Sequence, residues 1–381
     1  MVASAASAVA QAFGRFTYPL LLTAIASDLG LTYTVAGGLA SVNLVAYLLG
    51  TVTVTVLAAR LIPGAILRLG LVGSVTGLGL AALSPGPVAL AAALAVTGFS
   101  GALVWVPAPA VGVSRLPPRL RGLGFGSIGA GIGLGIVGAG ILAIPIRAHP
   151  DPGAWRWLFG VEAAVGLVVL LVTAITLRRP TGERLAVTGV KVSAIRAVPG
   201  WVALLAAYGA FGFAYAWFMN FLVAMLEVDR AITATSASVV FLVMGAATIP
   251  GGVVVGRLSD LWGRRSTLAT AFALMAVGSL GARFAPPWLL FASVALFGFT
   301  FAGIPTVIAA YLGDRAPEAA FSSAFGVATL SFGVAQMLAP QVGGIIGDAL
   351  GGFTLVFVGS AVLAVGGVVA SLRLPPDQPR S

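Results

Sequence analysis

The chain alternates between long apolar segments and short polar breaks along its 381 residues. A helix needs about 20 mainly apolar residues to cross the hydrocarbon layer of a bilayer. Twelve segments meet this requirement, at 3–27, 34–59, 64–83, 87–113, 122–146, 155–177, 198–226, 233–256, 265–284, 287–311, 320–346 and 353–373. The pattern predicts an all-α integral membrane protein with twelve transmembrane helices, divided into an N-terminal six-helix half (1–177), a cytoplasmic linker (178–197) and a C-terminal six-helix half (198–381).

Composition supports this prediction and removes several classes of function. Only 8% of the residues are charged and 59% are hydrophobic, whereas a soluble domain has roughly 25% charged residues. The chain has no cysteine, and its one histidine is His149, so thiolate and histidine metal sites are not expected. We find no paired carboxylates, no Ser-His-Asp set and no phosphate-binding loop. We therefore expect no enzyme, no cofactor, and transport driven by gradients.

The basic residues predict the orientation of the chain. With a cytoplasmic N-terminus, sixteen of the 21 Lys and Arg residues fall in cytoplasmic loops and tails and four in outer loops, while Arg15 lies within a span. This bias places both termini in the cytoplasm, and it accounts for the net charge of +10 without any nucleic-acid partner. Lys191 is the only lysine, a bias typical of GC-rich bacteria. We expect a monomer in a bacterial cytoplasmic membrane.

The two halves resemble each other at a nearly constant offset. Several identities recur 200 residues apart, namely Gly98-Phe99 and Gly298-Phe299, Arg115 and Arg315, Pro117 and Pro317, Gly126 and Gly326, and Gly133 and Gly333. A six-span duplication with both termini inside gives a parallel repeat about an axis along the membrane normal. In that plan the substrate binds near the midplane, between the halves.

A loop motif carries a family resemblance. The stretch from Gly256 through Asp260 and Gly263 to Arg264 and Arg265 resembles the G-x-x-x-D-R/K-x-G-R-R/K signature of the major facilitator superfamily, and it departs from it at Leu261. The resemblance implies a gating role, in which an acid at the start of the next helix holds the cytoplasmic ends of the halves together. The alternative is that these arginines only anchor the topology.

Two segments near the N-terminus narrow the resemblance to one branch. Residues 13–22 and 38–50 are similar to the first two spans of the YbfB/YjiJ-type branch of this superfamily. The superfamily resemblance covers the whole chain and implies two six-helix halves in a pseudo-twofold arrangement, transporting by alternating access. It does not indicate a substrate.

Arg15 is the main candidate for substrate binding. A lipid-facing arginine in mid-span would cost at least about 2.5–3.5 kcal/mol, so we expect Arg15 to face a cavity or a partner. In an α-helix, Gln11, Arg15 and Tyr18 would share one face. A guanidinium without an evident acid favours a carboxylate or phosphate ligand. Pairing with backbone carbonyls, pairing with Glu162, and snorkelling are the alternatives.

Other polar residues in the spans could contribute to a pocket. These predicted substrate-binding residues are Tyr18, Asn43, Tyr47, Trp105, Tyr208, Tyr215, Asn220 and Gln336, although aromatic residues near span ends also form interface belts. Glu162 is a candidate proton carrier, with a structural hydrogen bond as the alternative. The acids expected to be solvated at outer helix ends are Asp28, Glu227, Asp229 and Asp348.

These residues favour one function over a second. The leading hypothesis is a secondary transporter that moves a small organic anion, such as a mono- or aromatic carboxylate, across the bilayer by alternating access. Arg15 would be the counter-ion, and a proton or counter-anion would couple the transport. The alternative is efflux of hydrophobic, drug-like metabolites through an aromatic-lined pocket.

Overall fold

The computed structural model describes residues 1–58, 60–113, 121–148, 151, 153–177, 192–317 and 320–376. Most of the predicted linker (178–191) lies outside these ranges, as do His149 and the basic residues Arg115, Arg119, Arg178, Arg179, Arg184, Lys191 and Arg380. No strand occurs in the described ranges.

The N-terminal half contains α1 (Val2–Ser7), the π-helix η1 (Ala8–Phe16), α2 (Thr17–Leu29), α3 (Tyr33–Ala58), α4 (Pro63–Ala82), α5 (Pro87–Trp105), α6 (Ala108–Val113), α7 (Arg121–Arg147) and α8 (Trp155–Thr176). The rest of the chain contains α9 (Val192–Arg196), α10 (Trp201–Val228), α11 (Ala234–Trp262), α12 (Arg264–Phe284), α13 (Pro287–Arg315), α14 (Phe321–Leu350) and α15 (Thr354–Leu372).

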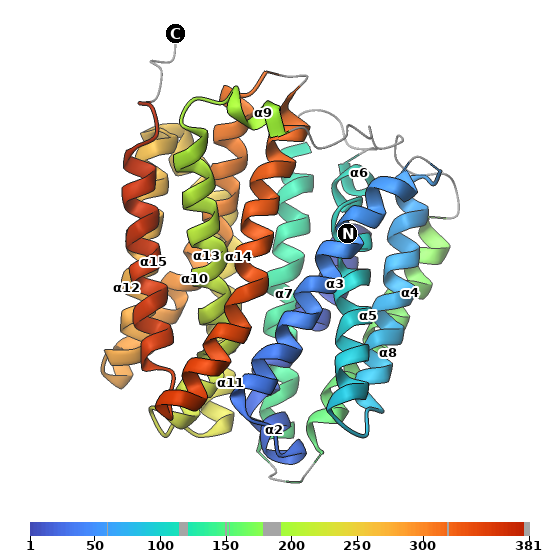
Figure 1. Cartoon of the computed structure of the whole chain (residues 1–381). Helices are drawn as coiled ribbons and strands as arrows, with labels where there is room; N and C mark the ends of the chain where they lie inside the picture. Colours follow the sequence, from blue (N-terminus) through green and yellow to red (C-terminus); the bar gives the residue numbers. More distant parts are fainter. Residues whose placement is uncertain are drawn as a thin grey trace.

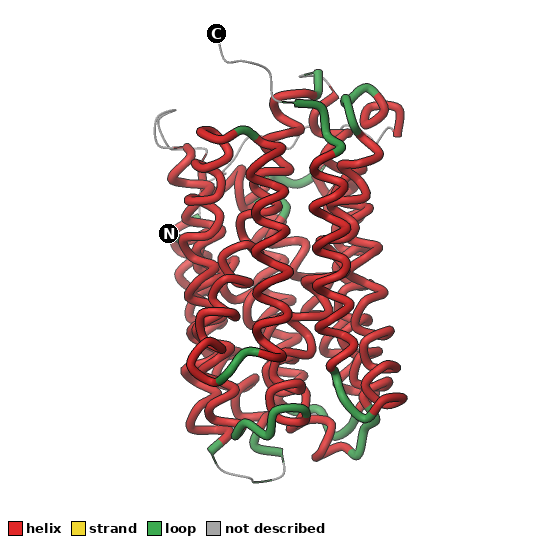
Figure 2. Tube along the Cα trace, turned by 90° about the vertical axis from the view of Figure 1, so that its left-hand side faces the viewer, coloured by secondary structure: helices red, strands yellow, loops and turns green. Residues whose placement is uncertain are grey.

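The predicted spans are present as helices. Eleven helices of the described chain are long and apolar enough to cross a membrane. The span predicted at 3–27 forms α1, η1 and α2 in succession, which completes the twelve, and the span predicted at 87–113 is divided between α5 and α6. Figure 2 shows these helices running the length of the molecule, with loops gathered at its two ends.

The bilayer interior explains why the spans are helical. Inside a bilayer every backbone N–H and C=O group must be satisfied within the protein, and a helix does this within one segment. Prolines begin three helices, where the missing N–H removes no bond: Pro63, Pro87 and Pro287.

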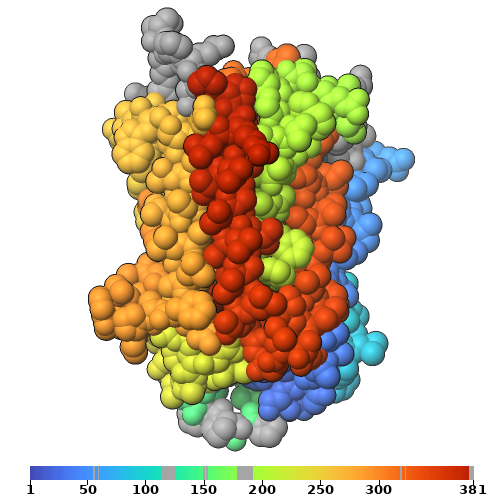
Figure 3. All heavy atoms as spheres, turned by 60° about the vertical axis from the view of Figure 1, so that its left-hand side comes forward, coloured from blue at the N-terminus to red at the C-terminus, as the bar shows by residue number. Residues whose placement is uncertain are grey.

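The outer surface of the bundle is apolar, as a lipid-facing surface must be. On α8, Val168, Leu171 and Ile175 are 55–60% exposed. Figure 3 looks onto α12, α15 and α10, where α15 carries the exposed Val362 and Val365.

The two halves lie side by side. In Figure 1, α4, α5 and α8 are on the right and α10, α12 and α15 on the left, with α7 and α14 between them. Three helix pairs make the main contacts between the halves, α7 with α11, α3 with α14 and α2 with α10. At Gly37 of α3 an added Cβ would collide with the backbone of Pro340 on α14, so this crossing requires a residue without a side chain.

Candidate functional site

The predicted site begins with the π-helix of span one. Gln11 donates from Nε2 to the Gly101 carbonyl at 3.0 Å, Tyr18 donates from its hydroxyl to the Ala36 carbonyl at 2.8 Å, and Arg15 points toward the other half. Arg15 and Tyr18 line the same cavity, and the Gln11 amide is directed at α5. The predicted shared face assumed an α-helix, but Ala8–Phe16 is a π-helix. A π-helix closes its turns with i→i+5 bonds, so its side chains follow a different angular spacing from those of an α-helix.

Arg15 contacts two residues of the C-terminal half. Its Nη2 donates hydrogen bonds to the Tyr215 hydroxyl on α10 and to Gln336 Oε1 on α14. Tyr215 in turn donates to Gln336 Oε1 at 2.5 Å. These three residues, here called the central triad, join the halves at mid-span.

The charge of Arg15 is held by neutral groups. Among the described residues, no carboxylate lies within the 4.0 Å of an ion pair with Arg15, and Glu162 is therefore not its partner. The guanidinium carbon lies 5.6 Å from the ring centres of Phe16 and Tyr47, and 5.8 Å from that of Tyr215. Aromatic faces at this distance stabilise a cation weakly.

The space beside Arg15 is small in this conformation. A cavity of about 10 Å³ is lined by Arg15, Phe16, Tyr18, Pro19, Ala40, Asn43, Leu44, Leu94, Tyr215 and Asn220. This volume is close to the minimum for one water molecule. A ligand larger than a water molecule can enter only when the helices around the cavity separate.

The predicted amides have different surroundings. The two N–H groups of Asn43 Nδ2 are shared among three acceptors, the Gly14 carbonyl at 3.1 Å, the Leu94 carbonyl at 2.9 Å and Thr97 Oγ1 at 3.0 Å. These bonds join α3 to η1 and α5. Asn220 Nδ2 donates to the Ala216 carbonyl of its own helix at 2.8 Å. Both asparagines line the cavity, and these bonds use both N–H groups of Asn43 but only one of the two of Asn220.

The remaining predicted residues lie in three different places. Tyr47 lies against Arg15, whereas Trp105 ends α5 and is absent from the lining of the cavity. Tyr208 belongs to an aromatic cluster that also contains Phe211, Tyr215, Phe301 and Phe332, with ring centres 4.8–6.2 Å apart.

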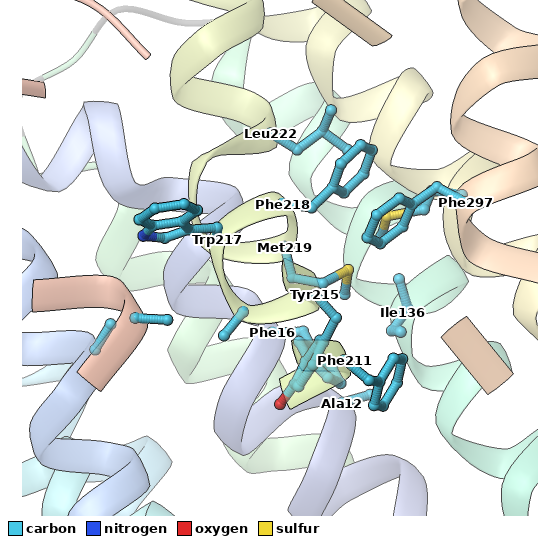
Figure 4. Packing of buried hydrophobic residues seen from close by; sticks show 14 of the residues in the cluster. Ala12, Phe16, Ile136, Phe211, Tyr215, Trp217, Phe218, Met219, Leu222 and Phe297 are labelled. Carbon is cyan, nitrogen blue, oxygen red and sulfur yellow. The ribbon is translucent and has the colours of Figure 1, made fainter. Parts of the chain in front are cut away.

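This cluster includes residues that the sequence analysis did not select. Phe301 and Phe332 come from α13 and α14, and Phe211 comes from α10. Figure 4 shows Phe211 and Tyr215 together on α10, with Phe218 stacked on Phe297 at 3.5 Å between ring centres further along that helix. The aromatic content of α10 was the only sequence signal for the cluster.

Glu162 is fully buried on α8. Its Oε1 accepts a hydrogen bond from Thr17 Oγ1 at 2.6 Å, and its Oε2 has no partner among the described residues. Thr17 is the first residue after η1, so Glu162 contacts span one where the π-helix becomes an α-helix.

A group of polar contacts closes the outer end, meaning the end where α2 finishes and α3 begins. Arg147 on α7 donates to Glu227 Oε1 on α10 at 2.5 Å, and Thr23 on α2 donates to Glu227 Oε2 at 2.7 Å. We call these three residues the outer latch. They border a cavity of about 580 Å³ on the outer side.

All four outer acids have hydrogen-bonding partners. Asp348 is exposed, as expected, whereas Asp28, Glu227 and Asp229 are more buried than expected. Asp28 pairs with Arg156 at 2.7 Å, and Glu227 belongs to the outer latch. Asp229 accepts from the Phe353 amide at 3.0 Å, and Asp348 accepts from the amides of Tyr33 and Thr34 at the start of α3. Helix starts have free N–H groups, which makes them good partners for carboxylates.

The loop motif is placed differently from the prediction. Asp260 lies in the last turn of α11, not at the start of the next helix, because α11 continues to Trp262 and α12 begins at Arg264. Gly263 joins them with φ = 87°, a conformation suited to glycine. Arg264 pairs with Asp260 at 2.7 Å and with Asp314 on α13 at 2.8 Å. The gating role of Gly256, Asp260, Gly263, Arg264 and Arg265 stays a prediction.

Comparison with known proteins gives a whole-chain match. The profile of a family described as "Uncharacterised MFS-type transporter YbfB" matches residues 7–371. A protein of Bacillus subtilis named "Uncharacterized MFS-type transporter YybF" is 24% identical over 148 residues, or 39% of this chain and 37% of that protein. "Hippocampus abundant transcript 1 protein" of Mus musculus is 31% identical over 121 residues, or 32% of this chain and 24% of that protein. The chain therefore aligns with less than two fifths of the length of each of these relatives.

Solved structures share the fold. A bacterial homologue of the human lysosomal transporter Spinster, inward-facing and unoccupied, has a TM-score of 0.74 at 14% identity, covering 97% of this chain and 92% of that one. A D-xylose-proton symporter has a TM-score of 0.76 at 14% identity, covering 98% and 97%. At this identity the likeness establishes the architecture alone.

Proposed function

The chain belongs to the YbfB-type family of major facilitator superfamily transporters, and from this premise we propose that it carries a small organic anion, with Arg15 as the counter-ion. The observation that supports this most is the central triad, in which a mid-span guanidinium meets only neutral acceptors. A charge in the membrane core is costly unless it is neutralised. A bound anion would supply the missing negative charge.

The chemistry of the triad favours a carboxylate. A guanidinium presents parallel N–H donors that match the two oxygens of a carboxylate. Tyr215 and Gln336 would turn to the remaining oxygen lone pairs or to a substituent of the ligand. The aromatic cluster beside them suits an aromatic or aliphatic body, so mono- and aromatic carboxylates are the best candidates.

The triad also connects binding to alternating access. Arg15 belongs to the N-terminal half, whereas Tyr215 and Gln336 belong to the C-terminal half. A ligand that replaces these hydrogen bonds changes how the halves contact each other at mid-span. We propose that the halves 1–177 and 198–381 rock about this point, with the cytoplasmic motif around Asp260 and the outer latch closing alternately.

Ligand-dependent thermal stability tests the proposal. A ligand that binds only the folded protein raises its unfolding temperature by mass action. We expect carboxylates such as benzoate to stabilise the wild type and not Arg15→Ala. Arg156→Ala serves as the matched control, because Arg156 is also partly buried and pairs with Asp28 away from the cavity. If Arg15→Ala is stabilised as much as the wild type, Arg15 is not the counter-ion.

The aromatic cluster supports a second candidate, the efflux of hydrophobic compounds. Tyr208, Phe211 and Phe332 stack within 4.8–6.1 Å of one another and could bind an apolar molecule without Arg15. In that case neutral or cationic hydrophobic compounds would raise the unfolding temperature equally in wild type and Arg15→Ala. The same measurement therefore separates the two functions.

The cellular setting is also part of the proposal. We propose a monomer in a bacterial cytoplasmic membrane, with both termini inside. Because the sequence has no cysteine, single cysteines introduced in each loop can be labelled from one side of the membrane. Labelling of the 178–197 linker from outside intact cells would contradict this orientation.

A further inference from the structure

Span one carries an arginine and, two residues later, a threonine that contacts a buried glutamate. Arg15, in η1, reaches toward α10 and α14, whereas Thr17, two residues later, holds the carboxyl of Glu162 on α8. The stretch between them is where the π-helix ends. Short π-helical segments within α-helices are frequent at functional sites.

Glu162 has the surroundings of a neutral acid. It is fully buried, one carboxyl oxygen contacts only a hydroxyl, and the other has no partner among the described residues. Burying an unpaired carboxylate is far more costly than burying a carboxylic acid. A hydroxyl can donate to a carboxylate or accept from a carboxylic acid, so the Thr17 contact fits either protonation state.

No charged group of the neighbouring helices compensates Glu162. The helices that contact α8 are α1, η1, α2, α4 and α7. None of the described ionisable side chains on these helices forms an ion pair with Glu162. These side chains are Arg15, Tyr18, Asp28, Arg68 and Arg147. A proton is therefore the simplest species that can neutralise this carboxylate.

We propose that Glu162 is a proton-binding site coupled to Arg15 through the π-helical turn, so that the anion and one proton cross the membrane together. This inference builds on the proposed anion site. With anion and proton bound, the charges of Arg15 and Glu162 are both neutralised. With neither bound, the positive and negative charges balance. The two half-loaded carriers hold a net charge in the core, which disfavours their passage through the membrane.

Binding of benzoate to wild type and variants, across pH, tests the coupling. Benzoate stays ionised between about pH 6 and pH 9, so any pH dependence comes from the protein. In the wild type we expect the Kd to rise by up to about tenfold per pH unit once Glu162 ionises, as linkage of one proton to one anion requires. In Glu162→Gln the Kd should stay low and independent of pH, because glutamine imitates the neutral acid.

Matched variants keep the test specific. Thr17→Ser retains the hydroxyl and should behave as the wild type, whereas Thr17→Ala should shift the pH dependence. Asp151→Asn removes an exposed carboxylate at the outer end, outside the outer latch, and should keep the pH dependence. Infrared spectra add a measurement without ligand: a neutral-carboxyl band that disappears on raising the pH should be absent from Glu162→Gln.

The outcomes distinguish the two proposals. If benzoate binds through Arg15 but its Kd is the same at every pH, or if Glu162→Gln retains the neutral-carboxyl band, Glu162 is only a structural hydrogen-bonding group and the coupling is wrong. If no carboxylate binds the wild type, the anion proposal fails, and the coupling fails with it.

Discussion

Neutralising Glu227 in the outer latch should shift the transporter toward an outward-open conformation. In the closed arrangement, Arg147 donates to Glu227 at 2.5 Å, and only 4% of the Arg147 side chain is exposed. Glu227→Gln leaves this guanidinium buried beside a neutral amide. In an outward-open state both residues meet water, so the cost of the change falls mainly on the closed state.

The size of the shift follows from the type of bond that is lost. Breaking a fully buried ion pair costs about 3–5 kcal/mol. Because 18% of the Glu227 side chain is exposed, the lower range of about 1.5–3 kcal/mol for hydrogen bonds to charged groups is the better choice. With 1.4 kcal/mol for each factor of ten, the ratio of open to closed protein should rise by about 10- to 150-fold.

Distances between spin labels on the two halves measure this ratio. The sequence has no native cysteine, so labels can be placed at Ala148, after α7, and at Leu350, the last residue of α14, both of which are exposed. We expect a longer distance to appear or to gain population in Glu227→Gln. Asp151→Asn is the matched control, since Asp151 is an exposed acid that lines the same outer cavity.

Two results would refute the reasoning. One is an unchanged distance distribution in Glu227→Gln, which would mean that the latch does not hold the outer end closed. The other is an equal change in Asp151→Asn, which would point to the general loss of negative charge. Adding Arg147→Gln to Glu227→Gln should restore part of the closed population, because the buried unpaired charge is then gone.

Three further predictions concern stability and motion. Asn43→Ala should lower the free energy of unfolding by about 1–3 kcal/mol, because it removes two N–H donors that bond α3 to η1 and α5. An unchanged thermal stability would contradict this. Gly37→Val should slow transport, because the added side chain would clash with the α14 backbone. Gly79→Ala should not, because there is open space around Gly79. Equal transport rates would show that the α3–α14 contact is unimportant. Gly263→Ala should lower the free energy of unfolding by about 1–3 kcal/mol, since φ = 87° with ψ = 157° strains any residue with a side chain. Unfolding in denaturant measures this loss, with Gly79→Ala as the control.

Some features of the candidate site could be predicted because they depend on depth in the membrane alone. A charge in mid-span is costly wherever its neighbours lie, so Arg15 stood out from hydropathy. Its partners could not be found in this way. Tyr215 and Gln336 are 200 and 321 residues away, and they reach Arg15 only because the two halves pack face to face.

Other features could not be predicted, because a residue type does not specify its partner. Asn43 was selected as a substrate-binding residue, which stays a prediction, but the sequence did not indicate that its amide nitrogen also joins three helices. Asp348 was expected at an exposed helix end, but the sequence did not indicate that it accepts the free N–H groups at the start of α3. The π-helix at Ala8–Phe16 has no signature in composition, since the same apolar residues suit an α-helix.

The sequence by itself determined the twelve spans, because the length and apolarity that a bilayer requires are local properties of each segment. It also predicted the orientation from the loop charges, and it identified the one arginine that the membrane core would otherwise exclude. The tertiary structure alone decided which side chains meet that arginine, which acid stays without an ion-pair partner on α8, and which end of the bundle the Arg147–Glu227 pair closes. These depend on contacts between helices far apart in the chain, and such contacts are set by how all the helix surfaces fit together at once.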